Sequence, residues 1–301
     1  MRLLERIAAC STESELEALC DEQILDTRPV SDDRPYFFNQ LRLSTLPQLY
    51  RRGLPEYAGE FGNLKATMML LIILAVTVAG MAAGIYWPLR QVGLPRDLPP
   101  RVFRAGVLYF SAIGLGYMLI EMAFVQRFSV LLGHPTNALA WVIASMVLAT
   151  GIGSLVSARL PTDRPRLFLV YPIVIVGVQT LAWLLLPTVF ALTVASSLPL
   201  RIATTLAFTV PCGLVMGLGF PLGMVQVGRV SETVTPWMWG INGAAGVVGT
   251  VLAVFLSMLW GISFTMAVGI GCYAMVLAAN WLLMGSDAPT AKVFVDGKLP
   301  A

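Results

Sequence analysis

The sequence has few charged residues. Only 12% of its 301 residues are Asp, Glu, Lys or Arg, whereas 57% are hydrophobic and the mean hydropathy is +0.76. Soluble domains carry about 25% charged residues. The shortage excludes an ordinary soluble domain and indicates a multi-pass membrane protein. The net charge is +3, and the arginines lie in short loops between apolar runs, where they normally set topology, so no nucleic-acid partner is expected.

Histidine and cysteine are also scarce. The chain has one histidine and four cysteines, and no two cysteines form a C-x-x-C pair. A metal cluster built on histidines is therefore excluded, and we expect neither a disulfide framework nor a metal site. The sequence also lacks G-x-S-x-G, Walker and H-E-x-x-H motifs. Because the first residues have no apolar core and no cleavage site of a signal peptide, we expect the first span to direct insertion.

Long apolar runs dominate the sequence from residue 66 onward. Each run has close to the roughly 20 residues that are needed to cross a bilayer core. The runs cover residues 66–87, 105–133, 137–158, 167–187, 202–226, 237–259 and 263–284. We therefore predict an all-α, polytopic membrane helix bundle of about seven transmembrane helices, with the lipid bilayer as its surroundings.

The acidic residues divide the chain into regions. Eleven of the 17 Asp and Glu residues precede residue 66. We expect a small N-terminal segment over residues 1–43, a linker over 44–65, a transmembrane domain over 66–284 and an exposed tail over 285–301. About 40 residues bury too little surface to form a stable domain alone, so the first segment is interpreted as part of something larger.

The loop arginines give a bias in membrane orientation. Residues 90–104, 159–166 and 229 place more positive charge on one side than residues 51–65 and 201 place on the other. Positive loops normally stay in the cytoplasm, so the bias favours an N-terminus outside. A folded partner at the N-terminus can override this bias, and the orientation stays open.

The second run contains polar residues at membrane depth. Glu121, Gln126 and Arg127 lie inside it, where each charge costs at least about 2.5 to 3.5 kcal/mol and is usually paired. Glu121 and Arg127 lie about 120° apart around a helix, so we expect their partners on other helices. The polar candidates are Gln179, Asn242 and Thr250. We expect Glu121, Gln126, Arg127 and Asn242 to form one intramembrane polar site. Three interpretations remain: a polar clamp that fixes helix register, a polar cavity for a proton, ion or solute, and snorkelling to the interface.

A hairpin closes this second run. Gly133 is followed by His134, Pro135, Thr136 and Asn137, a combination that breaks helices. We expect Thr136 or Asn137 to cap the third span. A lone histidine in such a turn is more typical of a hydrogen-bonding turn residue than of a catalytic group.

The fifth run contains several helix breakers. Prolines remove backbone donors, and glycines loosen the helix. These residues are Pro211, Gly213, Gly217, Gly219, Pro221 and Gly223. We expect a kinked or broken helix here, and such helices often line substrate sites in transporters.

Five ordered motifs carry a resemblance to a known family. They are residues 31–39 (SDDRPYFFN), 114–128 (GLGYMLIEMAFVQRF), 132–136 (LGHPT), 219–223 (GFPLG) and 239–246 (WGINGAAG). Together they resemble the C-terminal part of bacterial spermidine-synthase-like multi-pass membrane proteins. In that family a Rossmann-type, methyltransferase-like domain precedes a hydrophobic domain.

The resemblance implies roles for the first residues and a location. Residues 1–43 would be the C-terminal remnant of the methyltransferase-like domain. Asp32, Asp33, Arg34 and Pro35 would form the motif at its exit. The location implied is the bacterial inner membrane.

The resemblance also implies chemistry that involves S-adenosylmethionine. The glycine-rich turn and the acidic residues that bind such a cofactor would precede Met1, so we expect no cofactor in this chain unless a partner supplies the site. Whether the chain is an enzyme stays open. The expected function is a membrane module that anchors or docks a methyltransferase-like chain or other membrane-complex subunits. The alternatives are a small-solute or proton-coupled transporter with a polar site around Glu121 and Arg127, and the membrane subunit of a transferase that a second chain completes.

Overall fold

The computed structural model describes residues 2–10, 12–22, 30–36, 62–92 and 99–284. Most of the predicted linker and the predicted tail lie outside these residues. None of the described residues belongs to a β-strand, and the β-type contact among them is an isolated bridge between Ser31 and Arg34. The described part of the chain is therefore helical.

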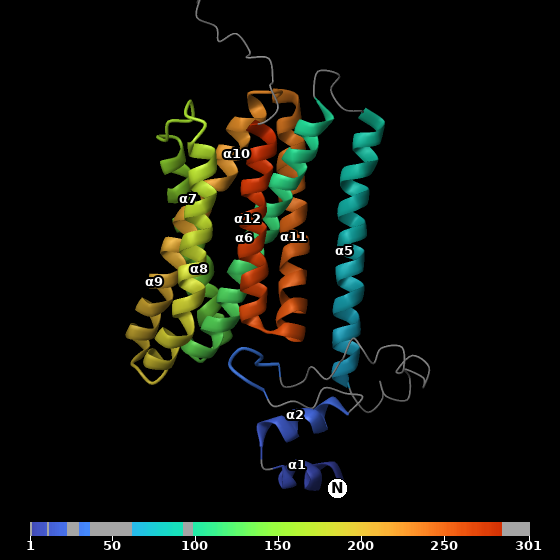
Figure 1. Cartoon of the computed structure of the whole chain (residues 1–301), viewed down its shortest axis with the longest axis vertical. Helices are drawn as coiled ribbons and strands as arrows, with labels where there is room; N and C mark the ends of the chain where they lie inside the picture. The colour runs from blue at the N-terminus through green and yellow to red at the C-terminus, as the bar shows by residue number, and fades with distance from the viewer. Residues whose placement is uncertain (1, 11, 23–29, 37–61, 93–98, 285–301) are drawn as a thin grey trace, which may run out of the picture.

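Seven helical spans among the described residues are long and apolar enough to cross a membrane. Their helices run side by side along one axis (Figure 1). The helices are α5 (Gly62–Val92), α6 (Pro100–Leu132), α7 (Pro135–Ser157), α8 (Leu167–Thr193), α9 (Leu198–Met216) with α10 (Gly219–Gly228), α11 (Thr235–Trp260) and α12 (Ile262–Met284). The prediction of a multi-pass helical membrane protein with seven candidate spans is confirmed.

Several helices are longer than their apolar runs. α6 begins at Pro100, which is the first helical position and needs no N–H partner there. At 33 residues it is about 50 Å long, and Glu121 lies about 16 Å from its last residue. α8 continues to Thr193 past Pro187, where the predicted span ends. A transmembrane helix tolerates the missing donor because neighbouring groups satisfy the freed carbonyl.

α6 is the central helix of the bundle. Of its 33 residues 19 are buried, compared with 7 of 23 in α7 and 8 of 27 in α8. It packs against α11 and α12 along its length and also contacts α7, α9 and α10. Tyr109, Phe110, Phe124 and Phe128 are fully buried on it. Glu121 and Arg127 on this helix are consequently buried within the protein.

α5 is the peripheral helix. It packs against α11, and none of its span is buried. A Cβ atom added to Gly80 or Gly84 would meet nothing within 4 Å, so this pair does not mediate close helix packing. By contrast, a Cβ atom on Gly213 of α9 would lie 2.9 Å from the Ala149 side chain on α7. Close approach through glycine therefore occurs inside the bundle.

The N-terminal helices α1 (Arg2–Ala9) and α2 (Glu13–Asp21) lie beyond one end of the bundle (Figure 1). Thr12 and Glu15 form a capping box at the start of α2. Arg6 pairs with Glu22 across 2.9 Å, joining the two helices. The assignment of this segment to a methyltransferase-like domain stays a prediction.

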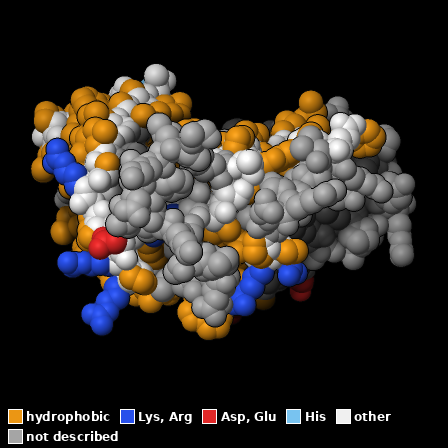
Figure 2. All heavy atoms as spheres, turned by 90° about the horizontal axis from the view of Figure 1, so that it is seen from above, with side chains coloured by type: hydrophobic (Ala, Val, Ile, Leu, Met, Phe, Trp, Pro, Cys, Tyr) orange, Lys and Arg blue, Asp and Glu red, His pale blue; other side chains and the backbone are white. Residues whose placement is uncertain are grey.

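The opposite end of the bundle carries a group of arginines. They lie at the start of α6, between α7 and α8, and after α10, and they are Arg101, Arg104, Arg159, Arg164, Arg166 and Arg229. Figure 2 looks onto this end and shows Lys and Arg side chains along its edge. The two ends of the bundle therefore differ: one holds this arginine group and the other faces the N-terminal helices.

Candidate functional site

Arg127 binds the N-terminal segment. Its Nη2 donates hydrogen bonds to Asp33 Oδ1 at 2.8 Å and to Ser263 Oγ at 2.9 Å, and its Nη1 donates to the Asp32 carbonyl at 3.0 Å. The Arg127 residue is only 7% exposed. Its charge is therefore compensated at the end of α6 by a segment that precedes all seven spans.

Asp33 also caps the last helix. Its Oδ1 accepts from the Ser263 amide at 2.9 Å and from the Ser263 hydroxyl at 2.6 Å, and its carbonyl accepts from the Ile262 amide at 2.9 Å. The first amides of a helix lack intrahelical partners, and the helix dipole favours an anion there. Asp33 thus provides hydrogen-bond acceptors for the first amides of α12, although it lies 230 residues earlier in the sequence.

The turn between α11 and α12 fits closely around Asp33. Gly261 has φ of +99°, in the left-handed region that favours glycine. A Cβ atom at this position would collide with Asp33 Oδ2 and would lie 3.2 Å from its Cγ. Gly261 is therefore required both by the backbone and by the docked carboxylate.

The residues around Asp33 extend the contact. Arg34 donates to the Met258 carbonyl near the end of α11 at 3.4 Å, whereas Pro35 is exposed. Tyr36 is half-buried, and burial raises the pKa of its hydroxyl to about 12. The predicted exit motif is thus bound to the bundle through the Asp32 carbonyl and the Asp33 and Arg34 side chains. We name residues 31–36 the docking segment.

Glu121 has its hydrogen bond within its own helix. Its Oε1 accepts from the Tyr117 hydroxyl, one turn away on α6, and Thr150 on α7 donates to that same hydroxyl, both at 3.5 Å. The expectation of a partner on another helix is therefore wrong for Glu121 in the described part of the chain. Gln126 Oε1 is buried without a partner among the described residues.

The four residues predicted to form one intramembrane polar site have different neighbours. Arg127 contacts the docking segment, and Glu121 contacts Tyr117. Asn242 lies on α11, where it lines a cavity. Their hydrogen bonds therefore do not join them into one cluster.

The hairpin after α6 is capped by its histidine. Gly133, with φ of +73°, ends α6, and Pro135 is the first residue of α7. His134 Nδ1 accepts from the Thr136 amide at 3.2 Å, so the cap of the third span is His134 and not Thr136 or Asn137. Pro135 at the first helical position has no N–H, so it leaves no unsatisfied donor there.

The fifth span is interrupted between α9 and α10. α9 ends at Met216 and α10 begins at Gly219, within the stretch where the sequence predicts a break. Pro211 lies inside α9 and Pro221 inside α10. A Cβ atom on Gly217 would collide with the Thr150 carbonyl of α7, so glycine permits this contact. Gly223 similarly meets the ring of Tyr109.

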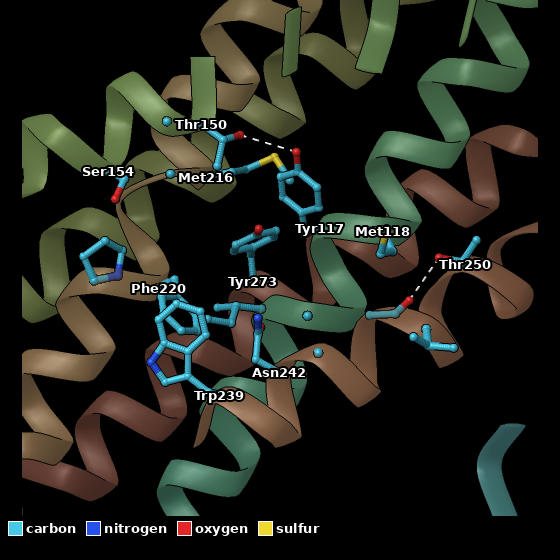
Figure 3. Close-up of a pocket in the computed structure, with 18 residues that line it drawn as sticks. Tyr117, Met118, Thr150, Ser154, Met216, Phe220, Trp239, Asn242, Thr250 and Tyr273 are labelled. Atoms are coloured by element: carbon cyan, nitrogen blue, oxygen red, sulfur yellow. Dashed lines mark hydrogen bonds between the residues drawn. The ribbon is translucent and has the colours of Figure 1, made fainter. Parts of the chain in front are cut away.

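A cavity of about 490 Å³ lies beside this break. It is bounded by α6, α7, α10 and α11, with the end of α9 and Tyr273 of α12 (Figure 3). Its lining residues are Ile113, Gly114, Tyr117, Met118, Thr150, Gly151, Ser154, Met216, Gly217, Phe220, Pro221, Trp239, Asn242, Gly243, Gly246, Val247, Thr250 and Tyr273. None of these side chains is charged.

A second polar cluster was not identified from the sequence. Tyr109 on α6 donates to the Gly219 carbonyl and contacts the Tyr171 hydroxyl. Asn280 on α12 donates to the Tyr171 hydroxyl at 3.0 Å and to the Phe168 carbonyl at 2.7 Å. The network joins α6, α8, α10 and α12. The sequence feature that could have indicated this cluster is Asn280, because it is a polar residue within an apolar run.

No family model matches the chain, and no curated protein or solved structure matches it. Its class follows from its described residues, which include seven apolar helical spans, as found in multi-pass membrane proteins.

Proposed function

We propose that this chain is the membrane module of a spermidine-synthase-like protein and that it anchors a methyltransferase-like partner at the α6 C-terminal end of the bundle. The observation that carries the proposal is the docking of Asp33 between Arg127 and the start of α12. The partner domain is either joined to this chain or carried by another. Other subunits of a membrane complex would bind at the same end.

The geometry of the docking segment supports an anchoring role. A single carboxylate oxygen accepts from the Arg127 guanidinium and from both donors of Ser263. Charge-assisted hydrogen bonds of this kind are about twice as strong as neutral ones. The main chain adds two contacts, through the carbonyls of Asp32 and Asp33. These contacts hold the docking segment against the end of the bundle, which supports an anchoring role.

The hydrogen bonds favour anchoring over the transporter alternative. A proton-coupled site around Glu121 and Arg127 requires both groups to act together. Arg127 is already bound by the docking segment, and Glu121 is bound to Tyr117. The third alternative, a transferase completed by a second chain, agrees with anchoring, because the partner would supply the S-adenosylmethionine site.

Purification from native membranes in mild detergent tests the proposal. Asp33→Asn removes the charge that Arg127 binds. Asp32→Asn is the matched control, because the Asp32 side chain is exposed and this residue contacts Arg127 through its main-chain carbonyl. We expect a methyltransferase-like polypeptide to co-purify with the wild type and with Asp32→Asn, and to be depleted with Asp33→Asn.

Two results would contradict this proposal. Equal recovery of the partner with Asp33→Asn, at an unchanged thermal midpoint of the bundle, would show that docking does not hold it. Binding of S-adenosylmethionine by this chain alone, measured by calorimetry, would show that the cofactor site is not the partner's.

A further inference from the structure

We propose that the cavity between α6, α7, α10 and α11 binds an uncharged amphiphile from the membrane, whose hydroxyl group forms hydrogen bonds with Asn242 and its polar neighbours. The inference goes beyond anchoring, because it assigns a ligand to a part of the bundle distant in sequence from the docking segment. It is supported by the position of the cavity, by its polar groups and by the absence of charged residues from its lining.

The cavity opens on the lateral surface of the bundle. Trp239 is 60% exposed and Val247 is 59% exposed, and both line the cavity. Gly151 on the facing helix α7 and Gly243 on α11 are also exposed. All four belong to candidate membrane spans. A ligand would therefore enter from the lipid, without crossing a loop.

Two of the polar groups that line the cavity, Asn242 and Ser154, lie toward one of its ends. On α11, the lining residues run from Trp239 to Thr250, a distance of about 16 Å along the helix axis. Asn242 lies about two turns from the start of α11, and Ser154 is in the last turn of α7, so both lie toward the arginine-bearing end. Met118 and Val247 line the rest of the cavity, where the Tyr117 and Thr250 hydroxyls already have hydrogen-bond partners within the protein. A single-chain amphiphile would therefore lie parallel to the lipid tails with its head at Asn242.

Several of these groups have no partner within the protein. Among the described residues, neither the Asn242 amide nor the Ser154 and Tyr273 hydroxyls have a hydrogen-bond partner, although all three line the cavity. Figure 3 shows the Asn242 side chain beside Trp239 and Tyr273. An unsatisfied polar group is costly at membrane depth. A ligand hydroxyl can satisfy the amide and one hydroxyl together.

The absence of charge among the lining residues selects the class of ligand. A phosphate or carboxylate head would bring an unpaired anion into a low-dielectric site, which is strongly unfavourable. A hydroxyl carries no such penalty. The volume of about 490 Å³ lies within the usual range of small-molecule sites, about 300 to 1,000 Å³. These properties fit a long-chain alcohol better than a phospholipid.

Photo-crosslinking in phosphatidylcholine nanodiscs tests the inference with two probes of equal chain length. One is a diazirine-bearing hexadecanol, and the other is the corresponding hexadecanoate. We expect the alcohol to label the lining stretches 113–118 and 239–250 well above the lipid-facing residues of α8. We expect the carboxylate to label these stretches no more than α8. Equal labelling by both probes, or labelling of all lipid-facing surfaces alike, would overturn the proposal.

Two glycines on α11 provide a matched pair of variants. Gly243 lines the cavity and Gly240 does not, yet both are exposed and an added Cβ atom meets nothing within 4 Å at either. Gly243→Leu should reduce alcohol labelling to the α8 background, whereas Gly240→Leu should leave it unchanged. Unchanged labelling in Gly243→Leu would contradict a ligand in this cavity.

Asn242→Ala tests the hydrogen bond. A net hydrogen bond contributes enough to change affinity by about threefold to tenfold, so alcohol labelling should fall by that factor. Equal thermal midpoints of the variants establish that each remains folded. A folded Asn242→Ala protein that labels like the wild type would overturn the assignment of the head-group contact.

Discussion

Asp33 Oδ1 lies 2.8 Å from Arg127 Nη2, although 94 residues separate them in the sequence. The pair joins the docking segment to the central helix of the bundle. The Arg127 side chain is 9% exposed and that of Asp33 is 36% exposed, so the pair is screened less than a surface ion pair. This relationship gives Arg127 a partner that does not lie on a transmembrane helix.

Replacing Arg127 by alanine should destabilise the protein by about 1–3 kcal/mol, because the Asp33 carboxylate loses its charged partner. Arg127→Lys should have an intermediate effect, since an ammonium lacks the fork that reaches both Asp33 and the Asp32 carbonyl. Amide hydrogen exchange of residues 30–36 and the thermal midpoint measure both effects. The control is Arg101→Ala, an exposed arginine at the opposite end. An exchange rate in Arg127→Ala equal to that of this control would contradict the assignment.

Gly261→Ala should release the docking segment. The backbone conformation at Gly261 costs about 1–3 kcal/mol for other residues, and the new methyl group would also collide with Asp33. Gly271→Ala on α12 is the control, because its Cβ atom would meet nothing within 4 Å. Protease sensitivity between residues 22 and 62 reports the release. Similar cleavage rates in the two variants would argue against the close fit around Asp33.

Tyr109→Phe should destabilise the bundle by about 1–3 kcal/mol, because the Gly219 carbonyl and the Tyr171 hydroxyl lose a buried partner. Tyr273→Phe should change stability far less, since its hydroxyl has no hydrogen-bond partner among the described residues. Unfolding of both variants in a detergent titration gives the comparison. Equal losses would indicate that the hydroxyl of Tyr109 contributes no more than that of Tyr273.

The arginine-bearing end should face the cytoplasm, because positive loops are retained there. A cysteine at Ser196, between α8 and α9, should react with a membrane-impermeant thiol reagent in intact cells. A cysteine at Ser231, after α10 at the arginine-bearing end, should react only after the membrane is opened. Both variants are made in a background without the native cysteines. The reverse pattern would mean that the N-terminal partner sets the orientation.

The spans could be predicted from the sequence because hydropathy acts locally. Bilayer thickness fixes the length of an apolar run, so seven runs give seven candidate helices. The ends of the helices were harder to predict, as α8 shows by continuing past Pro187. Proline chemistry marks helix ends reliably in water, whereas a membrane bundle accommodates the lost donor.

The neighbours of the polar residues could not be predicted from helical periodicity. The 120° between Glu121 and Arg127 shows that they do not pair, but it gives no information on the segment that reaches Arg127 from before the first span. Glu121 instead accepts a hydrogen bond from the hydroxyl of Tyr117, a residue that belongs to the apolar run itself. The cavity depends on how several helices meet, and it has no local signal beyond the breakers of the fifth run.

The cap that Asp33 provides to α12 also orders events during synthesis. The carboxylate leaves the ribosome 230 residues before the Ser263 amide that it accepts from. At about 5–20 residues per second, that interval is about 10–50 s. Throughout it the docking segment lacks its contacts with α12, because Ser263 has not yet been made. The contact between Asp33 and the start of α12 can therefore form only after translation of the last helix begins, which makes completion of the docking a late step in biogenesis.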